Sequence, residues 1–365
     1  MKNNARYDHK KLKALAVLIF EKLGYPAGQS EIIADVLVTA DLFGVTSHGL
    51  QRLNLYEYGL RIGRIKLDAK PKILKETPLS ALIDAGDAMG QVASAEAMRL
   101  AIKKAKQSGM GVVVTRNNNH FGIAGYYSRM AMLEGLLGIC MTNSEALMVP
   151  TNGKRAMLGS NPIAIAMPAE PVPFMLDMAT AVVPRGKLEV YMKDGKPIPA
   201  GWAVGADGKV STDPVAVNEC FVKKTAGGIL PLGGLGEILG GHKGYGIALA
   251  VELFTSIIAC GYTSDMVRKV HDKDRSCSTF IAMDYGMFGD KKEIEAALSA
   301  YLGKLRASDK SDGADRIWTH GEKELLNSRE NETKGIYIQA KTLEEIREIS
   351  GRLGVDPAAF IELKA

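Results

Sequence analysis

The first 70 residues carry apolar side chains at the spacing of amphipathic helices. Within 12–23 these side chains recur every three or four positions, and glycine and proline follow directly, so we predict a helix that ends there. The same spacing predicts a second helix over 30–42, with Ser30 as its N-cap. A third helix is expected to begin at Ser47. Together these segments predict an N-terminal helical domain over residues 1–72.

The pattern changes after residue 71, where short aliphatic runs lie between glycines. Helical segments separate several of these runs, and Ser94 is the expected N-cap of one of them. Strands that alternate with helices are typical of an α/β layer domain, which we expect over 73–230 and 276–330. The runs interpreted as strands are "SALIDAG", "GMGVVVT", "GLLGICMT", "NPIAIAMP", "PFMLDMA" and "STFIAMDYGMF".

Three further segments complete the predicted organisation. Residues 193–235 are rich in Gly, Pro, Asp and Ser and predict long loops, which are often functional. Residues 231–275 combine a glycine loop with a strongly apolar helix that we expect to pack on the helical domain. Residues 331–365 predict a C-terminal helical tail.

The composition is that of an ordinary globular enzyme, with 46% hydrophobic and 24% charged residues. Lysine and arginine outnumber the acidic residues by 46 to 41, a formal net charge of +5. The basic residues are scattered and no arginine-rich run alternates with aromatic residues, which argues against a nucleic-acid partner. A mild positive balance suits a small anionic substrate.

The distribution of cysteine and histidine predicts no metal site. The four cysteines stand far apart without a CxxC pair, and the histidines are spread along the chain. Thiols in apolar surroundings fit a reducing compartment, so we expect a cytoplasmic protein. No apolar stretch reaches the roughly 20 residues that span a bilayer. The N-terminal run "ALAVLIF" is followed at once by Glu21 and Lys22, which indicates a helix of the mature protein rather than a signal peptide.

The stretch "ADLFGVTSHGLQRL", residues 40–53, places a histidine and an arginine within an apolar helical pattern. If Ser47 caps a helix, then His48, Arg52 and Tyr56 share one face at i, i+4 and i+8. This stripe suits a small hydroxy acid, because arginine holds a carboxylate through two hydrogen bonds while histidine and tyrosine transfer protons. A solvated polar face explains the same spacing equally well, so the stretch alone leaves both interpretations open.

A polar loop with His120 follows the run "GVVVT", which we expect to end as a strand at Thr115. Ligands of α/β folds bind beyond the carboxyl ends of strands, where this loop lies. Histidine titrates near neutral pH, which suits the removal of a proton from a substrate hydroxyl. We therefore favour a catalytic His120 over an exposed loop histidine.

The glycine-rich stretch "GGLGEILGGHKGYG", residues 233–246, precedes the apolar helix. The free N–H groups of a first helical turn bind anions, and Lys243 adds positive charge. The stretch matches neither a P-loop nor a Rossmann fingerprint, since Leu239 stands at the third glycine position. A flexible loop before a core helix is the alternative interpretation.

Several motifs occur together and in one order along the chain: "TSHGLQRL", "NNNHFG", "PTNGKRAMLGSNPIA", "MLDMATAVVPRGKLE" and "GGHKGYGIALAVEL". In this combination the sequence resembles the malate/L-lactate dehydrogenase family. Members of this family oxidise malate, lactate, sulfolactate or ureidoglycolate, and some reduce cyclic imino acids. The resemblance implies a non-Rossmann NAD(P)-binding α/β domain with an associated helical domain, in a homodimer.

The resemblance also assigns expected roles to individual residues. It implies that Ser47, His48 and Arg52 line the substrate site, to which the helical spacing adds Tyr56, and that His120 is the acid/base. His320 stands where many members carry proline, which makes the neighbouring contact the least secure. The implied cofactor contacts are Ser144, Asn161, Asp177, Met178, Ala179, His242, Lys243, Gly321 and Glu322.

We therefore predict an NAD(P)-dependent oxidoreductase that transfers a hydride between nicotinamide and a small 2-hydroxy acid. Malate/oxaloacetate is the leading pair, NAD is preferred to NADP, and His120 is preferred to His48 as the proton carrier. A dicarboxylate requires a second cationic anchor, for which protonated His48, Arg116 and Arg185 are the candidates. The alternatives are dehydrogenation of lactate, sulfolactate or ureidoglycolate, reduction of a cyclic imino acid, and anion binding without turnover.

Overall fold

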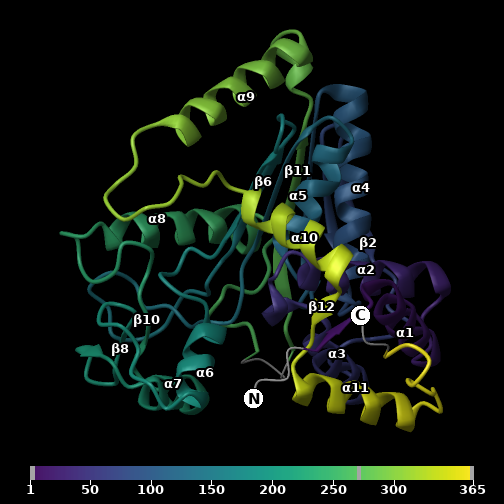
Figure 1. The fold of residues 1–365 in the computed structure, drawn as a ribbon, viewed down its shortest axis with the longest axis horizontal. Helices are drawn as coiled ribbons and strands as arrows, with labels where there is room; N and C mark the ends of the chain where they lie inside the picture. The colour runs from purple at the N-terminus through teal and green to yellow at the C-terminus, as the bar shows by residue number, and fades with distance from the viewer. Residues whose placement is uncertain (1–4, 269–272, 362–365) are drawn as a thin grey trace.

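The computed structural model describes residues 5–268 and 273–361, in which helices and short strands alternate along the chain (Figure 1). The helices are α1 (His9–Lys22), α2 (Ala27–Leu42), α3 (Leu53–Arg61), α4 (Gly90–Ser108), α5 (Ala124–Leu133), α6 (Arg185–Lys193), α7 (Pro214–Lys223), α8 (Gly241–Glu252), α9 (Lys291–Ala307), α10 (Glu322–Lys334) and α11 (Ala340–Arg352). The strands are β1 (Arg6–Tyr7), β2 (Lys72–Glu76), β3 (Ser80–Asp84), β4 (Met110–Asn118), β5 (Leu137–Thr142), β6 (Ile163–Met167), β7 (Phe174–Met178), β8 (Ala203–Val204), β9 (Val210–Ser211), β10 (Gly228–Ile229), β11 (Ser276–Met283) and β12 (Ile336–Tyr337).

A seven-stranded mixed sheet forms the centre of the molecule, in the order β2-β3-β4-β11-β5-β6-β7. β3 and β4 run parallel, whereas the other five neighbouring pairs are antiparallel. A Rossmann domain is instead built from successive parallel strands. The predicted non-Rossmann α/β fold is therefore confirmed, and six of the seven strands coincide with the predicted runs.

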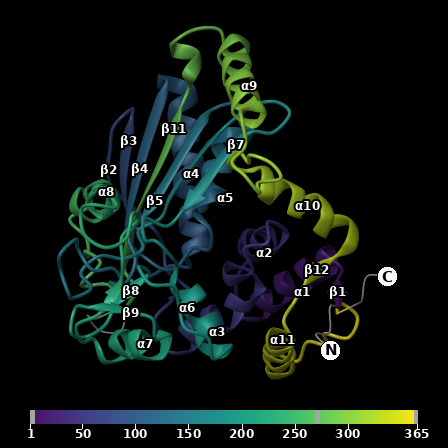
Figure 2. The same ribbon diagram turned by 60° about the vertical axis from the view of Figure 1, so that its left-hand side comes forward.

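Helices cover both faces of the sheet (Figure 2). α4 and α5 pack on one face, where Ala101 and Tyr127 join the same buried cluster as Phe280 of β11. α8 and the π-helical turn that follows it pack on the other face, where Val251 meets Ile281. We expected this apolar helix to pack on the helical domain. It lies on the sheet because β5 and β11 present apolar side chains on that face as well.

α1, α2, α3 and α11 form a helical layer with a core of its own beside the sheet. One buried cluster contains Leu15 of α1, Leu37 of α2, Tyr56 of α3 and Ile346 of α11. β1 also pairs with β12, so segments from the beginning and the end of the described chain meet here (Figure 2). The C-terminal tail therefore completes the N-terminal layer, because α11 has an apolar stripe that needs a partner.

Residues 185–229 form a small third layer, although we expected long loops over 193–235. α6 and α7 pack beside a three-stranded sheet of order β10-β8-β9. Leu188 and Ile229 share a buried cluster with Ala248 of α8, which attaches this layer to the central sheet. Strands of two residues show no alternation of polar and apolar positions, so the sequence pattern does not reveal them.

Two predicted helix starts are wrong. α2 begins at Ala27 after Pro26, and Ser30 lies inside the helix with its hydroxyl donating to the Tyr25 carbonyl at 3.3 Å. α4 begins at Gly90, and the buried Ser94 hydroxyl accepts a hydrogen bond from the Asn118 amide at 3.1 Å. Ser94 thus has a partner in a distant segment that its sequence neighbours do not indicate, whereas Ser30 bonds to the connection just before α2.

Three features bear on ligands and partners. In the described part of the chain, no helix is both long enough and apolar enough to cross a membrane. Within the same residues, no cluster of His, Cys, Asp and Glu is arranged to hold a metal ion. The four cysteines are free thiols, and of these Cys260 is exposed.

Candidate active site

A cavity of about 400 Å³ lies where the helical layer, the carboxyl ends of β4 and β5, and α6 meet. Five residues from the sequence predictions line it: His48, Arg52, His120, Ser144 and Arg185. They come from segments far apart along the chain, and the fold brings them together. The location agrees with the expectation that ligands bind beyond the carboxyl ends of strands.

The segment predicted to start the third helix consists of two 3₁₀ turns, Thr46–His48 and Leu50–Arg52, followed by α3. His48, Arg52 and Tyr56 therefore do not form one continuous helical stripe, which corrects the predicted geometry. His48 and Arg52 nevertheless face the cavity. Tyr56 is 1% exposed and lies beneath the cavity wall.

Asp41 of α2 supports these two turns from below. Its carboxylate accepts a hydrogen bond from the Leu50 N–H at 2.8 Å. Gly49 makes the approach possible, because a Cβ at this position would lie 2.0 Å from the Asp41 carboxylate. Burial raises the pKa of Asp41 to about 8, and the hydrogen bond from Leu50 opposes that rise. The "SHG" segment is thus held against a buried acid that sequence reasoning missed.

The two histidines lie together, with stacked rings whose centroids are 5.6 Å apart. The Tyr56 hydroxyl lies 2.7 Å from Nδ1 of His120, and the Ser47 hydroxyl lies 2.9 Å from Nδ1 of His48. Each ring therefore has a hydroxyl partner on one nitrogen. A hydroxyl donates or accepts, so it can serve either protonation state of the ring.

Both histidines favour the neutral form. Burial lowers the pKa of His48 to about 4, and the nearby Arg52 charge lowers it further. Burial also holds the pKa of His120 well below its ordinary value, assisted by His48, Arg52 and Arg268. A neutral imidazole is a ready base at neutral pH. A bound anion would offset the arginine charges and favour protonation.

Two of the three arginines that line the cavity, Arg52 and Arg268, are held by different partners. Arg52 donates through Nε to the Ser47 carbonyl at 2.6 Å, which turns its guanidinium along the wall. Arg268 is paired with Asp274 and, at 3.5 Å, with Glu145. Sequence reasoning missed Arg268 and these two acids, because their segments carry no motif that distinguishes them from solvated charges.

The two arginines proposed as second anchors lie in different places. Arg185 lines the cavity at the start of α6 and lies 3.2 Å from Glu189. Arg116 instead pairs with Asp84 at 3.2 Å, away from the cavity lining. The structure thus retains Arg185 and corrects the suggestion of Arg116.

Ser144 and Asn161, two predicted cofactor contacts, are joined behind the cavity wall. Asn161 is buried, and its side-chain oxygen accepts a hydrogen bond from the Ser144 N–H at 3.2 Å. Its amide nitrogen donates to Glu252 at 3.1 Å and to the Ala248 carbonyl at 3.1 Å. Asn161 thus shapes the loop that presents Ser144. Glu252, a buried hub of this loop, was not predicted.

The other predicted cofactor contacts lie outside the cavity lining. Asp177 is exposed near the end of β7, followed by Met178 and Ala179, and its carboxylate accepts from the Gly125 N–H at the start of α5 at 2.7 Å. His242 and Lys243 are exposed on the first turn of α8.

The "HGE" segment lies beside β7, since the Met175 N–H donates to the His320 carbonyl at 3.1 Å. Gly321 has a positive φ of 99° and precedes α10. The carboxylate of Glu322 is buried and paired with Arg306 at 3.3 Å and Arg316 at 2.7 Å. This carboxylate is therefore already occupied by partners within the chain.

Comparisons with known proteins agree with the predicted resemblance. The family model described as malate/L-lactate dehydrogenase matches residues 7–347. The chain is 45% identical to malate dehydrogenase of Pyrococcus horikoshii, over 97% of each chain. It is 40% identical to L-sulfolactate dehydrogenase of Methanocaldococcus jannaschii, over 96% of this chain and 98% of that one. The crystal structure of malate dehydrogenase from Entamoeba histolytica superposes with a TM-score of 0.93 at 34% identity and covers 96% of this chain and 98% of that chain.

Proposed function

Because the chain belongs to the malate/L-lactate dehydrogenase family, we propose that its 400 Å³ cavity is the site of hydride transfer between a nicotinamide cofactor and a small 2-hydroxy acid. Malate/oxaloacetate is the leading pair. One observation carries the proposal: a stacked pair of histidines and an arginine line the same cavity.

The described residues fit a nicotinamide dinucleotide. The first turn of α8 exposes Lys243 beside Gly240, which has a positive φ of 86°, and this turn suits a phosphate. Ser144 stands in the cavity wall and Asp177 at the end of β7, where a ribose hydroxyl would find an acceptor. When bound, the nicotinamide ring supplies or accepts the hydride. The negative charge of Asp177 favours NAD over NADP, whose ribose carries a phosphate.

Within this scheme His120 transfers the proton. In the oxidation direction, the neutral imidazole accepts the hydroxyl proton of the substrate, and the Tyr56 oxygen accepts a hydrogen bond from the second ring nitrogen. In the reduction direction, the protonated ring returns the proton to the carbonyl oxygen. Arg52 binds the substrate carboxylate through its terminal guanidinium nitrogens. His48 lines the same wall and contributes to anion binding.

A dicarboxylate finds a second cation in this cavity. Arg268 and Arg185 both line it, and each has an acidic neighbour that limits its excess charge. A sulfonate carries the same single negative charge in a tetrahedral group, so sulfolactate is the nearest alternative. Lactate and ureidoglycolate lack a second anionic group for this cation to bind. Reduction of a cyclic imino acid would require protonation of a nitrogen instead of a carbonyl oxygen.

We propose a homodimer in the cytoplasm. Apolar side chains cover the outer side of α8 and its π-helical turn, at Leu249, Leu253, Phe254, Ile257 and Ile258. They are between 41% and 53% exposed, a contiguous patch of the kind that protein interfaces bury. The free thiols suit a reducing compartment.

The test is a substrate panel. The purified protein is assayed with NADH and NADPH against oxaloacetate, pyruvate, sulfopyruvate and a cyclic imino acid, and kcat/KM values are compared. The proposal predicts the largest value for oxaloacetate with NADH. A larger value for the cyclic imine would make the protein a C=N reductase, and no turnover with any of these compounds would reject hydride transfer.

A further inference from the structure

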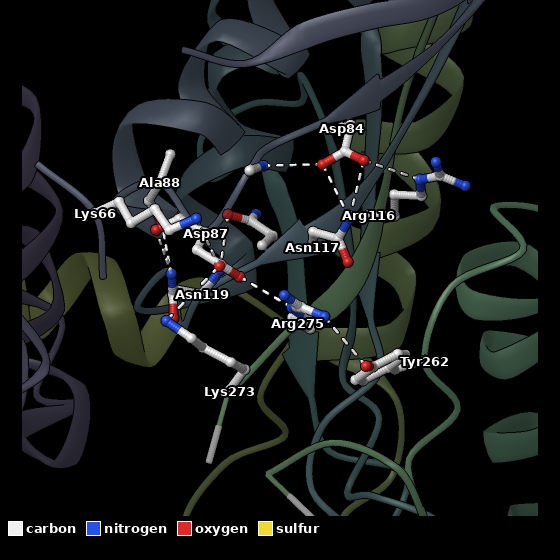
Figure 3. A network of polar contacts seen from close by, with 12 residues as sticks. Lys66, Asp84, Asp87, Ala88, Arg116, Asn117, Asn119, Tyr262, Lys273 and Arg275 are labelled. Carbon is white, nitrogen blue, oxygen red and sulfur yellow. Dashed lines mark hydrogen bonds and ion pairs between the residues drawn. The ribbon is translucent and has the colours of Figure 1, made fainter. Parts of the chain in front are cut away.

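A buried carboxylate, Asp87, lies behind the cavity wall in the turn between β3 and α4. Its side chain is 5% exposed and faces three cations: Arg275 at 3.2 Å, Lys66 at 3.5 Å and Lys273 at 3.7 Å (Figure 3). The residue has a positive φ of 65°, a conformation that residues other than glycine, asparagine and aspartate seldom adopt. A charge in such a place requires partners, and its partners lie in segments distant in sequence.

The turn around Asp87 holds the backbone of the His120 loop. The Asn119 amide donates to the carbonyl of Asp87 at 3.0 Å and to that of Ala88 at 2.8 Å (Figure 3). Gly90, three residues further on, packs directly against the loop, because a Cβ there would lie 2.2 Å from the His120 carbonyl oxygen. The backbone of the proposed acid/base therefore rests on residues 87–90.

The carboxylate of Asp87 also holds the opposite wall of the cavity. Lys273 and Arg275 flank Asp274, which lines the cavity and pairs with Arg268. Two ion pairs on either side of Asp274 fix the backbone that presents this acid. The position of the Arg268 side chain in the cavity thus depends on the same buried carboxylate.

A third contact reaches the helical layer. The Lys66 N–H donates to the Asp87 carbonyl at 2.9 Å, and the Lys66 ammonium pairs with the carboxylate. Lys66 follows α3, the helix that carries Tyr56. Asp87 therefore contacts the three segments that carry Tyr56, His120 and Asp274, and Asp274 in turn pairs with Arg268.

We propose that Asp87 is a positioning residue of the active site, which sets the distance between the His120 loop and the Arg268 wall. This inference rests on the proposed function of the cavity. Misplacement of reacting groups by about 1 Å can cost on the order of 10²-fold in rate. Loss of the carboxylate therefore reduces turnover although Asp87 touches no reacting atom.

The test compares Asp87→Asn with Asp84→Asn. Asparagine keeps the shape and tolerates the positive φ, but it removes the charge. Asp84 is a matched control, because its carboxylate accepts hydrogen bonds from Asn117 at 2.9 and 3.0 Å and from Arg116 at 3.2 Å in the same network (Figure 3). These Asp84 partners do not line the cavity.

Asp87→Asn should lower kcat/KM for oxaloacetate by about 10- to 100-fold, with NADH affinity within about threefold of wild type. Asp84→Asn should stay within about threefold in both quantities. The double variant Asp87→Asn/Arg275→Gln should lose less than the two single losses combined, because both changes remove the Asp87–Arg275 ion pair. If Asp87→Asn does not fold, Arg275→Gln alone is measured and should lower kcat/KM with NADH affinity retained, by less than the loss expected for Asp87→Asn because Lys66 and Lys273 still pair with the carboxylate.

Folded Asp87→Asn protein with near wild-type kcat/KM would overturn the positioning role, as would equal losses in both aspartate variants. Failure of the wild-type enzyme with oxaloacetate is a separate result, which rejects the proposed substrate. The variants are then compared on the acid or imine that the panel selects.

Discussion

The hydroxyl of Tyr56 offers a sharp test of the proposed proton transfer. It lies 2.7 Å from Nδ1 of His120, on a side chain that is 1% exposed. Among the described residues, the other hydrogen-bond partner of this nitrogen is the Gly122 N–H at 3.4 Å, which donates and cannot accept. Tyr56→Phe therefore leaves the Nδ1 proton of a protonated His120 without an acceptor.

The magnitude follows from the cost of that unpaired group. A buried polar group left without its partner costs about 1–3 kcal/mol, and about 1.4 kcal/mol corresponds to a factor of ten in rate. Because the protonated ring is the acid in oxaloacetate reduction, we expect kcat to fall by about 10- to 100-fold. Phenylalanine fills the same space, so the core of the helical layer should remain intact.

Tyr127→Phe is the matched control. Tyr127 is also fully buried, and its hydroxyl donates to the Phe121 carbonyl at 2.6 Å, one residue from His120. The two variants lose the same atom at nearby buried positions, so urea unfolding should show similar losses of stability. Steady-state assays should show the loss of kcat in Tyr56→Phe alone. Equal kcat losses in both variants, or wild-type kcat in Tyr56→Phe, would refute the coupling of Tyr56 to proton transfer.

Three further predictions follow from the same geometry. Arg52→Lys keeps the charge but loses the paired hydrogen bonds, so KM for oxaloacetate should rise about tenfold or more. NADH affinity, measured by nicotinamide fluorescence, should stay unchanged, and an unaltered KM would show that Arg52 does not bind substrate. The pKa of His48 in the folded protein is about 4, against an ordinary 6.5, so the contribution of the neutral ring to stability is complete above pH 6.5 and is lost as the pH falls to 4, by up to about 3 kcal/mol. Urea unfolding across pH should show this loss in wild type and not in His48→Gln, and identical pH slopes of the unfolding free energy in the two proteins would contradict the prediction. Phe254→Asp places a charge in the apolar patch and should shift the protein to monomers in sedimentation, with a wild-type dimer as the reference; an unshifted oligomeric state would place the interface elsewhere.

The sequence predicted the architecture best where one strand or helix is long and periodic. Runs such as "GMGVVVT" and "STFIAMDYGMF" became β4 and β11, neighbours at the middle of the sheet. The helix starts expected at Ser30 and Ser94 were misplaced, because α2 already begins after Pro26 and because Ser94 bonds to Asn118 of β4. Short strands such as β8 carry too few positions to show a pattern.

The sequence predicted the cavity residues that belong to motifs, but it did not predict the buried residues that hold them in place. His48, Arg52 and His120 do line one cavity, although the predicted helical stripe is in fact two turns. Asp87 and Glu252 were not predicted, because the partners that would identify a buried acid lie close to it only in the folded chain. No spacing in the sequence links Asp87 to Arg275, which lies 188 residues away.

The central claim is that this cavity reduces a keto acid with His120 as the acid/base. The most direct measurement compares wild type, His120→Ala and His48→Ala by NADH oxidation with oxaloacetate across pH. We expect a kcat loss of ~10²–10⁴-fold and a flattened pH profile of kcat/KM in His120→Ala, with NADH binding retained, and we expect His48→Ala to act mainly on KM. A His120→Ala enzyme with wild-type kcat, or a kcat loss in His48→Ala alone, would contradict it.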